Sequence, residues 1–202
     1  MPRTKKEKAS TRIPRKNQIE TIATNMFKER GFAATSMRDL ASAVGIEAAS
    51  IYSHVQSKEE ILHTICFKMA HEFFEAIEIS ENKTATYPER LQELILAHIT
   101  IILRNVAAAV VFQNEWRHLS EPYLSHFLEL REQYETRFRA LIQKGTQAGE
   151  FVPTDAQFVT RTLLLSLNGI PQWYAPNAEL TPENIAEKTA ALFLNGLRKA
   201  DK

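Results

Sequence analysis

The chain has 202 residues, with 25 Lys and Arg against 24 Asp and Glu and a formal net charge of +1. This length allows one small domain of about 60 residues and a second of about 140 residues with its own core. The single cysteine, Cys66, excludes an intramolecular disulfide and favours a reducing compartment. No apolar run approaches the roughly 20 residues of a membrane span, and the basic start lacks the apolar core of a signal peptide. We therefore expect a soluble, cytoplasmic protein.

Charge is distributed unevenly along the chain. Residues 1–16 hold seven Lys and Arg against one Glu, a net +6, so the remaining residues sum to −5. This basic, proline-punctuated stretch predicts a disordered arm over residues 1–16 that would follow a nucleic-acid backbone or minor groove in a salt-dependent way. The alternative is a tail that only improves solubility.

Apolar spacing predicts two helices before residue 45. The first carries a stripe at i, i+3, i+4, i+7 and i+8 over residues 19–27. The second carries a similar stripe over residues 37–44, and Ser36 with Asp39 three residues later is typical of a capping box at its start. Gly45 then permits a turn.

A third, shorter helix of about two and a half turns is predicted after this turn, because Ala48, Ile51 and Val55 share one face. A long helix then opens at a second capping-box pattern, Ser57 with Glu60. Two short helices around a glycine turn are typical of a helix-turn-helix, which places its second helix in the major groove of DNA. The alternative is a small three-helix bundle with a structural role only.

The side chains that face outward in this region suit contact with DNA. Small residues and hydroxyls allow close approach and hydrogen bonds at base edges, whereas phenol, imidazole and ammonium groups hold phosphates. Hydroxyls and free N–H groups at a helix start also bind phosphate. The predicted base contacts are Ala49, Ser50 and Ser53, and the predicted phosphate contacts are Tyr52, His54 and Lys58, with Thr35 and Ser36 as a further phosphate site.

The rest of the chain is predicted to be helical. The expected helices cover roughly 88–104, 107–119, 121–148, 155–174 and 182–199, and no segment alternates as a strand. The fold class is therefore all-α, with about nine helices in all. We expect a three-helix bundle containing the helix-turn-helix at 17–62, joined to a larger helical domain at 63–202.

Polar residues interrupt the apolar stripes of this larger domain, and burying them requires partners. Pro171 predicts a kink that could form one wall of a cavity, and aromatic residues nearby are typical of small-molecule sites. The predicted ligand contacts are His98, Phe112, Trp116, Arg131, Tyr134, Asn168 and Trp173. Each polar member has a structural alternative, such as an ion pair between Arg131 and Glu115 or a satisfied core histidine at His98.

A stripe of small residues and leucines predicts a dimer face on the last helix. It consists of Ala190, Ala191, Leu194 and Leu197. Helices 155–174 and 182–199 from two chains would then form a four-helix interface in a homodimer. The alternative is a monomer in which the stripe packs internally.

Residues 14–62 resemble the amino-terminal domain of the TetR family of bacterial transcriptional regulators. The resemblance rests on the string YSHVQSKEEI at residues 52–61, although Val55 stands where phenylalanine is usual and Glu47 where a small N-cap is common. It implies a ligand-responsive homodimer, most simply a repressor that a small-molecule effector releases from a palindromic operator in double-stranded DNA. Segments of the larger domain are similar to regulators of fatty-acid, phenylacetate or steroid catabolism, which implies an acyl-CoA effector. An alternative within the family is control of efflux through an aromatic or lipophilic effector.

Other functional classes are disfavoured. The six glycines form no phosphate-binding loop and no zinc-protease motif is present, so we expect neither an enzyme nor a cofactor. Glu115 and His118 have the Glu-x-x-His spacing of helical carboxylate metal sites, but those sites need a second copy, and we expect no metal. A ligand-independent DNA architectural protein would be basic over its whole surface, which the −5 sum outside the arm argues against.

Overall fold

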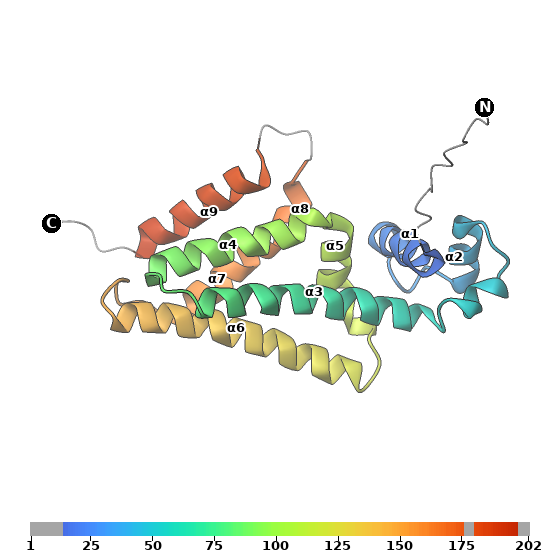
Figure 1. The fold of residues 1–202 in the computed structure, drawn as a ribbon, viewed down its shortest axis with the longest axis horizontal. Helices are drawn as coiled ribbons and strands as arrows, with labels where there is room; N and C mark the ends of the chain where they lie inside the picture. Colours follow the sequence, from blue (N-terminus) through green and yellow to red (C-terminus); the bar gives the residue numbers. More distant parts are fainter. Residues whose placement is uncertain (1–13, 176–179, 198–202) are drawn as a thin grey trace, which may run out of the picture.

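The computed structural model describes residues 14–175 and 180–197. Within those ranges it is helical with no strand, as the sequence predicts. The elements are α1 (Arg15–Arg30), α2 (Met37–Val44), the 3₁₀ turn η1 (Ser50–Ser53), α3 (Lys58–Glu81), α4 (Tyr87–Arg104), α5 (Val106–Asn114), the 3₁₀ turn η2 (Trp116–His118), α6 (Tyr123–Gln147), α7 (Ala156–Asn168), α8 (Ile170–Trp173) and α9 (Pro182–Leu197). Figure 1 shows α1 and α2 at one end of an elongated molecule and α4, α7 and α9 at the other, with α3 running between them.

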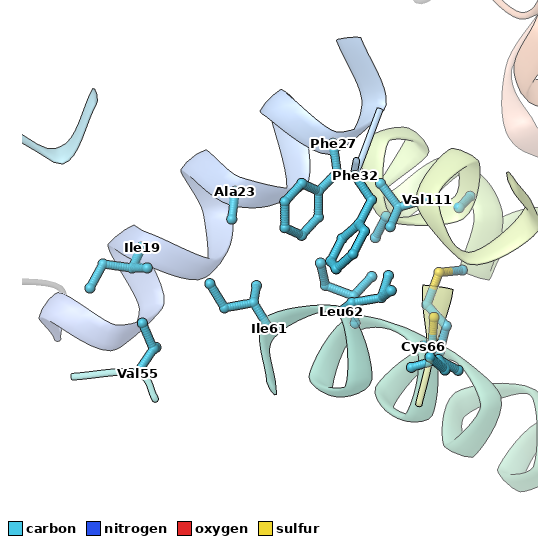
Figure 2. Close-up of a cluster of buried hydrophobic side chains, with 14 of the residues drawn as sticks. Ile19, Ala23, Phe27, Phe32, Val55, Ile61, Leu62, Cys66 and Val111 are labelled. Atoms are coloured by element: carbon cyan, nitrogen blue, oxygen red, sulfur yellow. The ribbon is translucent and has the colours of Figure 1, made fainter. Parts of the chain in front are cut away.

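The amino-terminal elements form around a small apolar core. Ile19, Ala23 and Phe27 of α1 pack with Val55, in the loop before α3, and with Leu62, in the first turns of α3 (Figure 2). Gly45 ends α2 in the left-handed conformation, with φ 75°, which a residue with a side chain rarely adopts. The predicted capping boxes are present in part: Ser36 and Asp39 form a complete one, and the Ser57 side chain accepts from the Glu60 N–H.

The third helix is shorter than predicted. Only Ser50–Ser53 is helical, as a single 3₁₀ turn, and Ala48 is exposed and not part of the inward face. Ile51 and Val55 are buried as expected. The Ser53 hydroxyl donates to the Ser50 carbonyl at 2.8 Å, and such local side-chain bonds compete with the regular helical ladder. The element after α2 is therefore a tight turn held by two buried apolar side chains.

One core extends through the predicted domain boundary. Leu62 and Cys66 of α3 pack in the same cluster as Phe27 of α1 and Val111 of α5 (Figure 2). Phe127 of α6 belongs to the same cluster. Helix α5 also contacts α1 directly. The predicted division at residue 62 thus falls inside the continuous helix α3, and α1 begins at Arg15, within the stretch predicted as the arm. The predicted arm residues 1–13 lie outside the described part of the chain.

Three of the four residues in the predicted dimer stripe of the last helix are buried within the chain, and only Ala191 is exposed. Ala190, Leu194 and Leu197 are 1–4% exposed and lie against α4 within the same chain. The large apolar side chains exposed on α7 and α9 are instead Phe158 and Leu165 of α7, 68% and 73% exposed, and Leu192 of α9, 73% exposed. An apolar stripe predicts burial of a helix face but does not say which neighbour covers it.

The helix predicted over 155–174 is broken at Gly169. Helix α7 ends at Asn168 and α8 begins at Ile170, with Pro171 in its first turn, where a missing N–H costs least. The helix predicted over 107–119 likewise separates into α5 and η2. Among the described residues no single helix is long and apolar enough to span a membrane; α4 and α5 reach that length and composition only as a pair bent by 101°.

Candidate DNA-binding surface and ligand cavity

The turn after α2 presents the predicted base-contacting side chains to solvent. Ala49, Ser50 and Ser53 are exposed, as are His54 and Tyr52, the latter by 57%. The proton of the Ser53 hydroxyl is used by the bond to Ser50, so Ser53 can offer only lone pairs to a base edge.

The predicted phosphate site at the start of α2 is not supported by its side chains. Thr35 is 1% exposed, and its hydroxyl donates to the Gly31 carbonyl at 2.9 Å. The Ser36 hydroxyl donates to the Asp39 carboxylate at 2.6 Å and accepts from the Asp39 N–H. The bonds that the Ser36 hydroxyl and the Ser36 backbone N–H donate to the carboxylate lower the pKa of Asp39, so a negative charge already occupies the helix start. The Ser36 hydroxyl therefore caps α2, and the Thr35 hydroxyl is taken up by the Gly31 carbonyl. The exposed cation Arg38 lies next to them in sequence and was not predicted as a phosphate contact.

Lys58 has an intramolecular role that the sequence did not predict. Its ammonium group donates to the carbonyls of Phe32 and Thr35 at 2.9 and 3.0 Å and lies 4.2 Å from the centre of the Phe32 ring. Two of its three N–H groups are thus used to hold the chain between α1 and α2, and one remains for a phosphate.

A cavity of about 550 Å³ lies in the larger helical region, between α3, α4, α5, α6 and α7. It is lined by five of the predicted ligand contacts, namely His98, Phe112, Arg131, Tyr134 and Asn168. The other two do not line it. Trp116 stands behind Arg131, with their ring and guanidinium 5.0 Å apart, and Trp173 is 57% exposed on α8.

The inner wall of the cavity is a neutral hydrogen-bonded network. His98, 2% exposed, contacts the Tyr134 hydroxyl through Nδ1 at 3.0 Å and the Asn168 Oδ1 through Nε2 at 3.3 Å. Gln113 also donates to that same oxygen, at 3.3 Å. Since Oδ1 can only accept, the proton lies on Nε2 and the tyrosine hydroxyl donates to Nδ1. Burial lowers the pKa of His98 to about 4, so the imidazole is neutral at pH 7.

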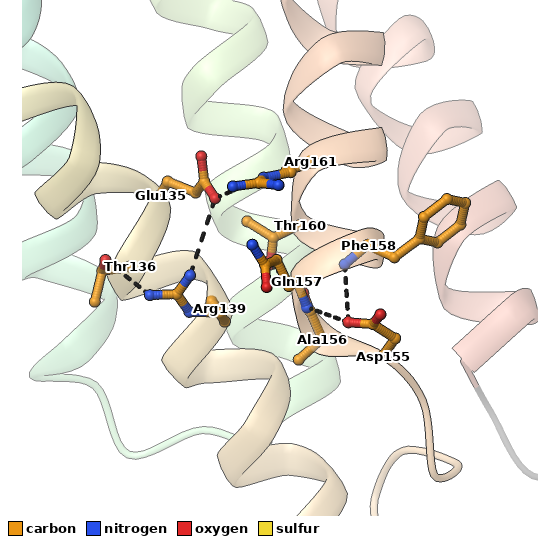
Figure 3. A network of polar contacts seen from close by, with 9 residues as sticks. All are labelled: Glu135, Thr136, Arg139, Asp155, Ala156, Gln157, Phe158, Thr160 and Arg161. Carbon is orange, nitrogen blue, oxygen red and sulfur yellow. Dashed lines mark hydrogen bonds and ion pairs between the residues drawn. The ribbon is translucent and has the colours of Figure 1, made fainter. Parts of the chain in front are cut away.

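The outer wall carries charge. Arg131, Glu135 and Arg139 lie four residues apart on one face of α6, and Arg161 of α7 faces them. Figure 3 shows Glu135 between Arg139 of α6 and Arg161 of α7. The ion-pair distances are 3.1 Å to Arg161 and 4.0 Å to Arg139. Arg131 makes no ion pair with any described residue. Its pKa is lowered mainly because the guanidinium is partly buried, and to a lesser extent because the Arg117 charge lies nearby. The spacing within α6 is visible in the sequence, but the approach of Arg161 is not.

The chain matches two descriptions of known sequence families. "Bacterial regulatory proteins, tetR family" matches residues 21–65, and "Tetracyclin repressor-like, C-terminal domain" matches residues 84–197. The HTH-type transcriptional repressor KstR2 of Mycobacterium tuberculosis is 30% identical over 187 residues, which cover 92% of this chain and 94% of that protein. The chain belongs to the TetR family. It is therefore a DNA-binding transcriptional regulator and not an enzyme.

Solved structures of TetR regulators have the same fold. That of KstR2 from Mycobacterium tuberculosis has a TM-score of 0.88 at 29% identity and covers 93% of this chain and 97% of that one. AibR, solved in complex with isovaleryl coenzyme A and operator DNA, has a TM-score of 0.77 at 23% identity and covers 89% and 97%. Within residues 14–175 and 180–197, no three His, Cys, Asp or Glu side chains are grouped to hold a metal ion.

Proposed function

We propose that the protein is a homodimeric repressor that binds a palindromic operator and leaves it when an acyl-CoA thioester occupies the cavity. The observation that carries this proposal is the contrast between the two walls of the cavity. The inner wall is aromatic and neutral, and the outer wall holds three arginines against two glutamates. An apolar acyl group and an anionic phosphate-bearing group match these two environments.

Two side chains are suited to fix the effector. The Nδ2 group of Asn168 makes no hydrogen bond to the described residues and lies on the cavity wall, so it can donate to a carbonyl oxygen such as that of a thioester. Arg131 carries an unpaired charge at the cavity and is free to bind a phosphate bidentately. AibR, which has this fold, was solved with isovaleryl coenzyme A and operator DNA together.

The exposed apolar residues favour a dimer through α7 and the outer side of α9. Phe158 and Leu165 of α7 and Leu192 of α9 are each more than two thirds exposed, and large apolar side chains left this exposed are candidates for burial against a second chain. A two-fold dimer would place two DNA-binding turns about 34–36 Å apart, which matches successive major grooves on one side of DNA. Phe158→Glu should give monomers in analytical ultracentrifugation, whereas Ile79→Glu, at an exposed apolar site on α3, should leave dimers intact.

On DNA, we assign base contacts to Ala49, Ser50 and Ser53, and phosphate contacts to Tyr52 and His54. Ser50→Ala should change the preference among operator sequences more than the total affinity, because a base-edge contact distinguishes sequences. A uniform loss of affinity on all sequences would remove Ser50 from base recognition. An operator-binding regulator acts where the chromosome lies, so the cytoplasm is the expected compartment.

The decisive experiment is native mass spectrometry of the purified protein with isovaleryl-CoA, phenylacetyl-CoA, lauroyl-CoA and free coenzyme A. Any thioester that binds is then tested for release of an operator selected from random duplexes. We expect a dimer with one thioester per chain and loss of DNA. Arg131→Ala should weaken thioester binding by about tenfold. Arg104→Ala, which removes an exposed arginine paired with Glu72 outside the cavity, is the matched control.

A regulator that responds to a neutral aromatic effector is the second candidate. It is favoured by the ring-lined inner wall, with Phe73, Phe112 and Phe127, and by the ion pairs that Arg139 and Arg161 already make with Glu135. A protein that ignores every thioester but releases DNA with a neutral polycyclic aromatic would support this candidate and exclude the acyl-CoA effector.

A further inference from the structure

The segment Glu115–His118 joins the cavity wall to the DNA-binding end of the molecule. Glu115 and Trp116 are adjacent in the chain, but Trp116 contacts residues of the cavity wall whereas Glu115 contacts the DNA-binding end. The Trp116 ring lies 5.0 Å from the guanidinium of Arg131 and 6.1 Å from the ring of Phe127, and both of these residues line the cavity. One peptide unit away, the Glu115 carboxylate accepts the backbone N–H of Phe32 at 3.1 Å.

Phe32 fixes the chain between α1 and α2. It is 5% exposed, and its ring contacts the rings of Phe27 and His118, each at 5.1 Å. Its carbonyl accepts from Lys58, which also holds the Thr35 carbonyl just before the cap of α2. A displacement of Phe32 would therefore move the start of α2, and with it the turn that presents Ser50 and its neighbours.

The Glu115 side chain is specialised for this contact. It is 18% exposed, and among the described residues the only basic side chain within 4.0 Å of it is His118, at 3.6 Å. Sequestering a carboxylate from water is unfavourable unless hydrogen bonds replace the lost solvation. The Phe32 N–H supplies such a bond across 83 positions of sequence.

We propose that Glu115 is a positioning residue for operator binding, and that the segment Glu115–His118 transmits movement of the cavity wall to Phe32. This rests on the proposed function for the identity of the cavity as the effector site. An effector that draws Arg131 toward itself withdraws the cation from Trp116, shifts the segment and weakens the hold of Glu115 on Phe32. The cavity and the DNA-binding end are thus coupled through two contacts, Trp116 with Arg131 and Glu115 with Phe32, that lie in one short turn.

Two variants of Glu115 separate positioning from folding. Glu115→Leu removes the acceptor and leaves the Phe32 N–H unbonded, whereas Glu115→Gln keeps an acceptor of similar shape without the charge. Amide hydrogen exchange, measured without DNA, should accelerate at Phe32 by at least about tenfold in Glu115→Leu and much less in Glu115→Gln. Operator affinity should fall by about tenfold in Glu115→Leu. In Glu115→Gln the loss of affinity should be smaller. Glu129→Leu, at an exposed glutamate of α6, is the control and should change neither quantity.

A double-mutant cycle tests transmission without any effector. Trp116→Leu alters the contact with Arg131, and we expect it to change operator affinity about fivefold in the wild-type background and by less than twofold in the Glu115→Leu background. Thermal unfolding confirms that each variant is folded before its affinity is read. Additive effects, or unchanged exchange at Phe32 in Glu115→Leu, would overturn the proposal. Because the cycle contains no thioester, failure of every thioester to bind would count against the proposed effector alone.

Discussion

Lowering the pH should destabilise the fold through His98. The pKa of this histidine is about 4 in the folded protein, against an ordinary value of 6.5, because burial disfavours the charged imidazole. The unfolded chain therefore binds a proton that the folded chain rejects. The contribution of the neutral histidine to the free energy of unfolding is fully present above pH 6.5. It is lost progressively as the pH falls from 6.5 to 4 and does not decrease further below pH 4.

The size of the effect follows from the shift in pKa. Each unit corresponds to about 1.4 kcal/mol, so the full loss is about 3 kcal/mol, of which about 2 kcal/mol is lost by pH 5. The groups that face the ring are Tyr134, Asn168 and Phe73, and none of them carries a charge at these pH values that could offset the penalty. The whole loss of unfolding free energy is therefore attributed to desolvation of the imidazolium.

Urea unfolding followed by circular dichroism at pH 7, 6 and 5 measures this contribution. The wild-type free energy of unfolding is compared with that of His98→Gln, which cannot titrate in this range, and of His71→Gln, which removes an exposed histidine paired with Glu75. Carboxylates such as Asp39 also titrate at low pH, but their contribution is common to all three proteins. Equal pH slopes for the wild type and His98→Gln would refute the assignment of a buried, neutral imidazole.

Three further predictions test the caps and the packing. Ser36→Ala and Thr86→Ala each remove a complete capping box and should each cost about 1 kcal/mol in urea unfolding, but only Ser36→Ala should weaken operator binding in a fluorescence anisotropy titration. Gly145→Ala would bring a Cβ atom into the ring of Phe151, so we expect a loss of about 1–3 kcal/mol and a lower melting temperature; an unchanged melting temperature would contradict this packing. Tyr134→Phe leaves the buried imidazole nitrogen without its donor, and calorimetry should show a loss of about 1–3 kcal/mol.

Local signals in the sequence were sufficient to predict most helices. The capping box at Ser36 and Asp39 marks the start of α2, and Gly45 marks its end, because both depend on interactions within a few residues. The apolar spacing of residues 19–27 likewise predicts which face of α1 is buried. The family resemblance in residues 52–61 added the function, which spacing alone leaves open between a DNA-binding element and a structural bundle.

Contacts between distant segments were the part that the sequence could not predict. The stripe at Ala190, Leu194 and Leu197 is buried as its composition indicates, yet it packs on α4 and not on a second chain. The charged wall of the cavity depends on Arg161 reaching Glu135 across two helices (Figure 3). The burial of Thr35 is set by the Gly31 carbonyl and by the fold of the turn, whereas its neighbours in sequence suggest an exposed hydroxyl.

Lys58 shows how one residue can satisfy both a family pattern and a structural need. Two of the three N–H groups of Lys58 hold the carbonyls that precede α2, which leaves one N–H for the phosphate contact that the family pattern predicts. Lys58→Ala should therefore reduce stability as well as operator affinity, and Lys58→Arg, with a planar fork in place of a compact ammonium, should not restore both carbonyl contacts. Loss of affinity in either variant is attributable to a missing phosphate contact only if amide exchange at Phe32 is unchanged. If exchange accelerates, the lysine acts mainly by holding the same turn that Glu115 holds from the other side.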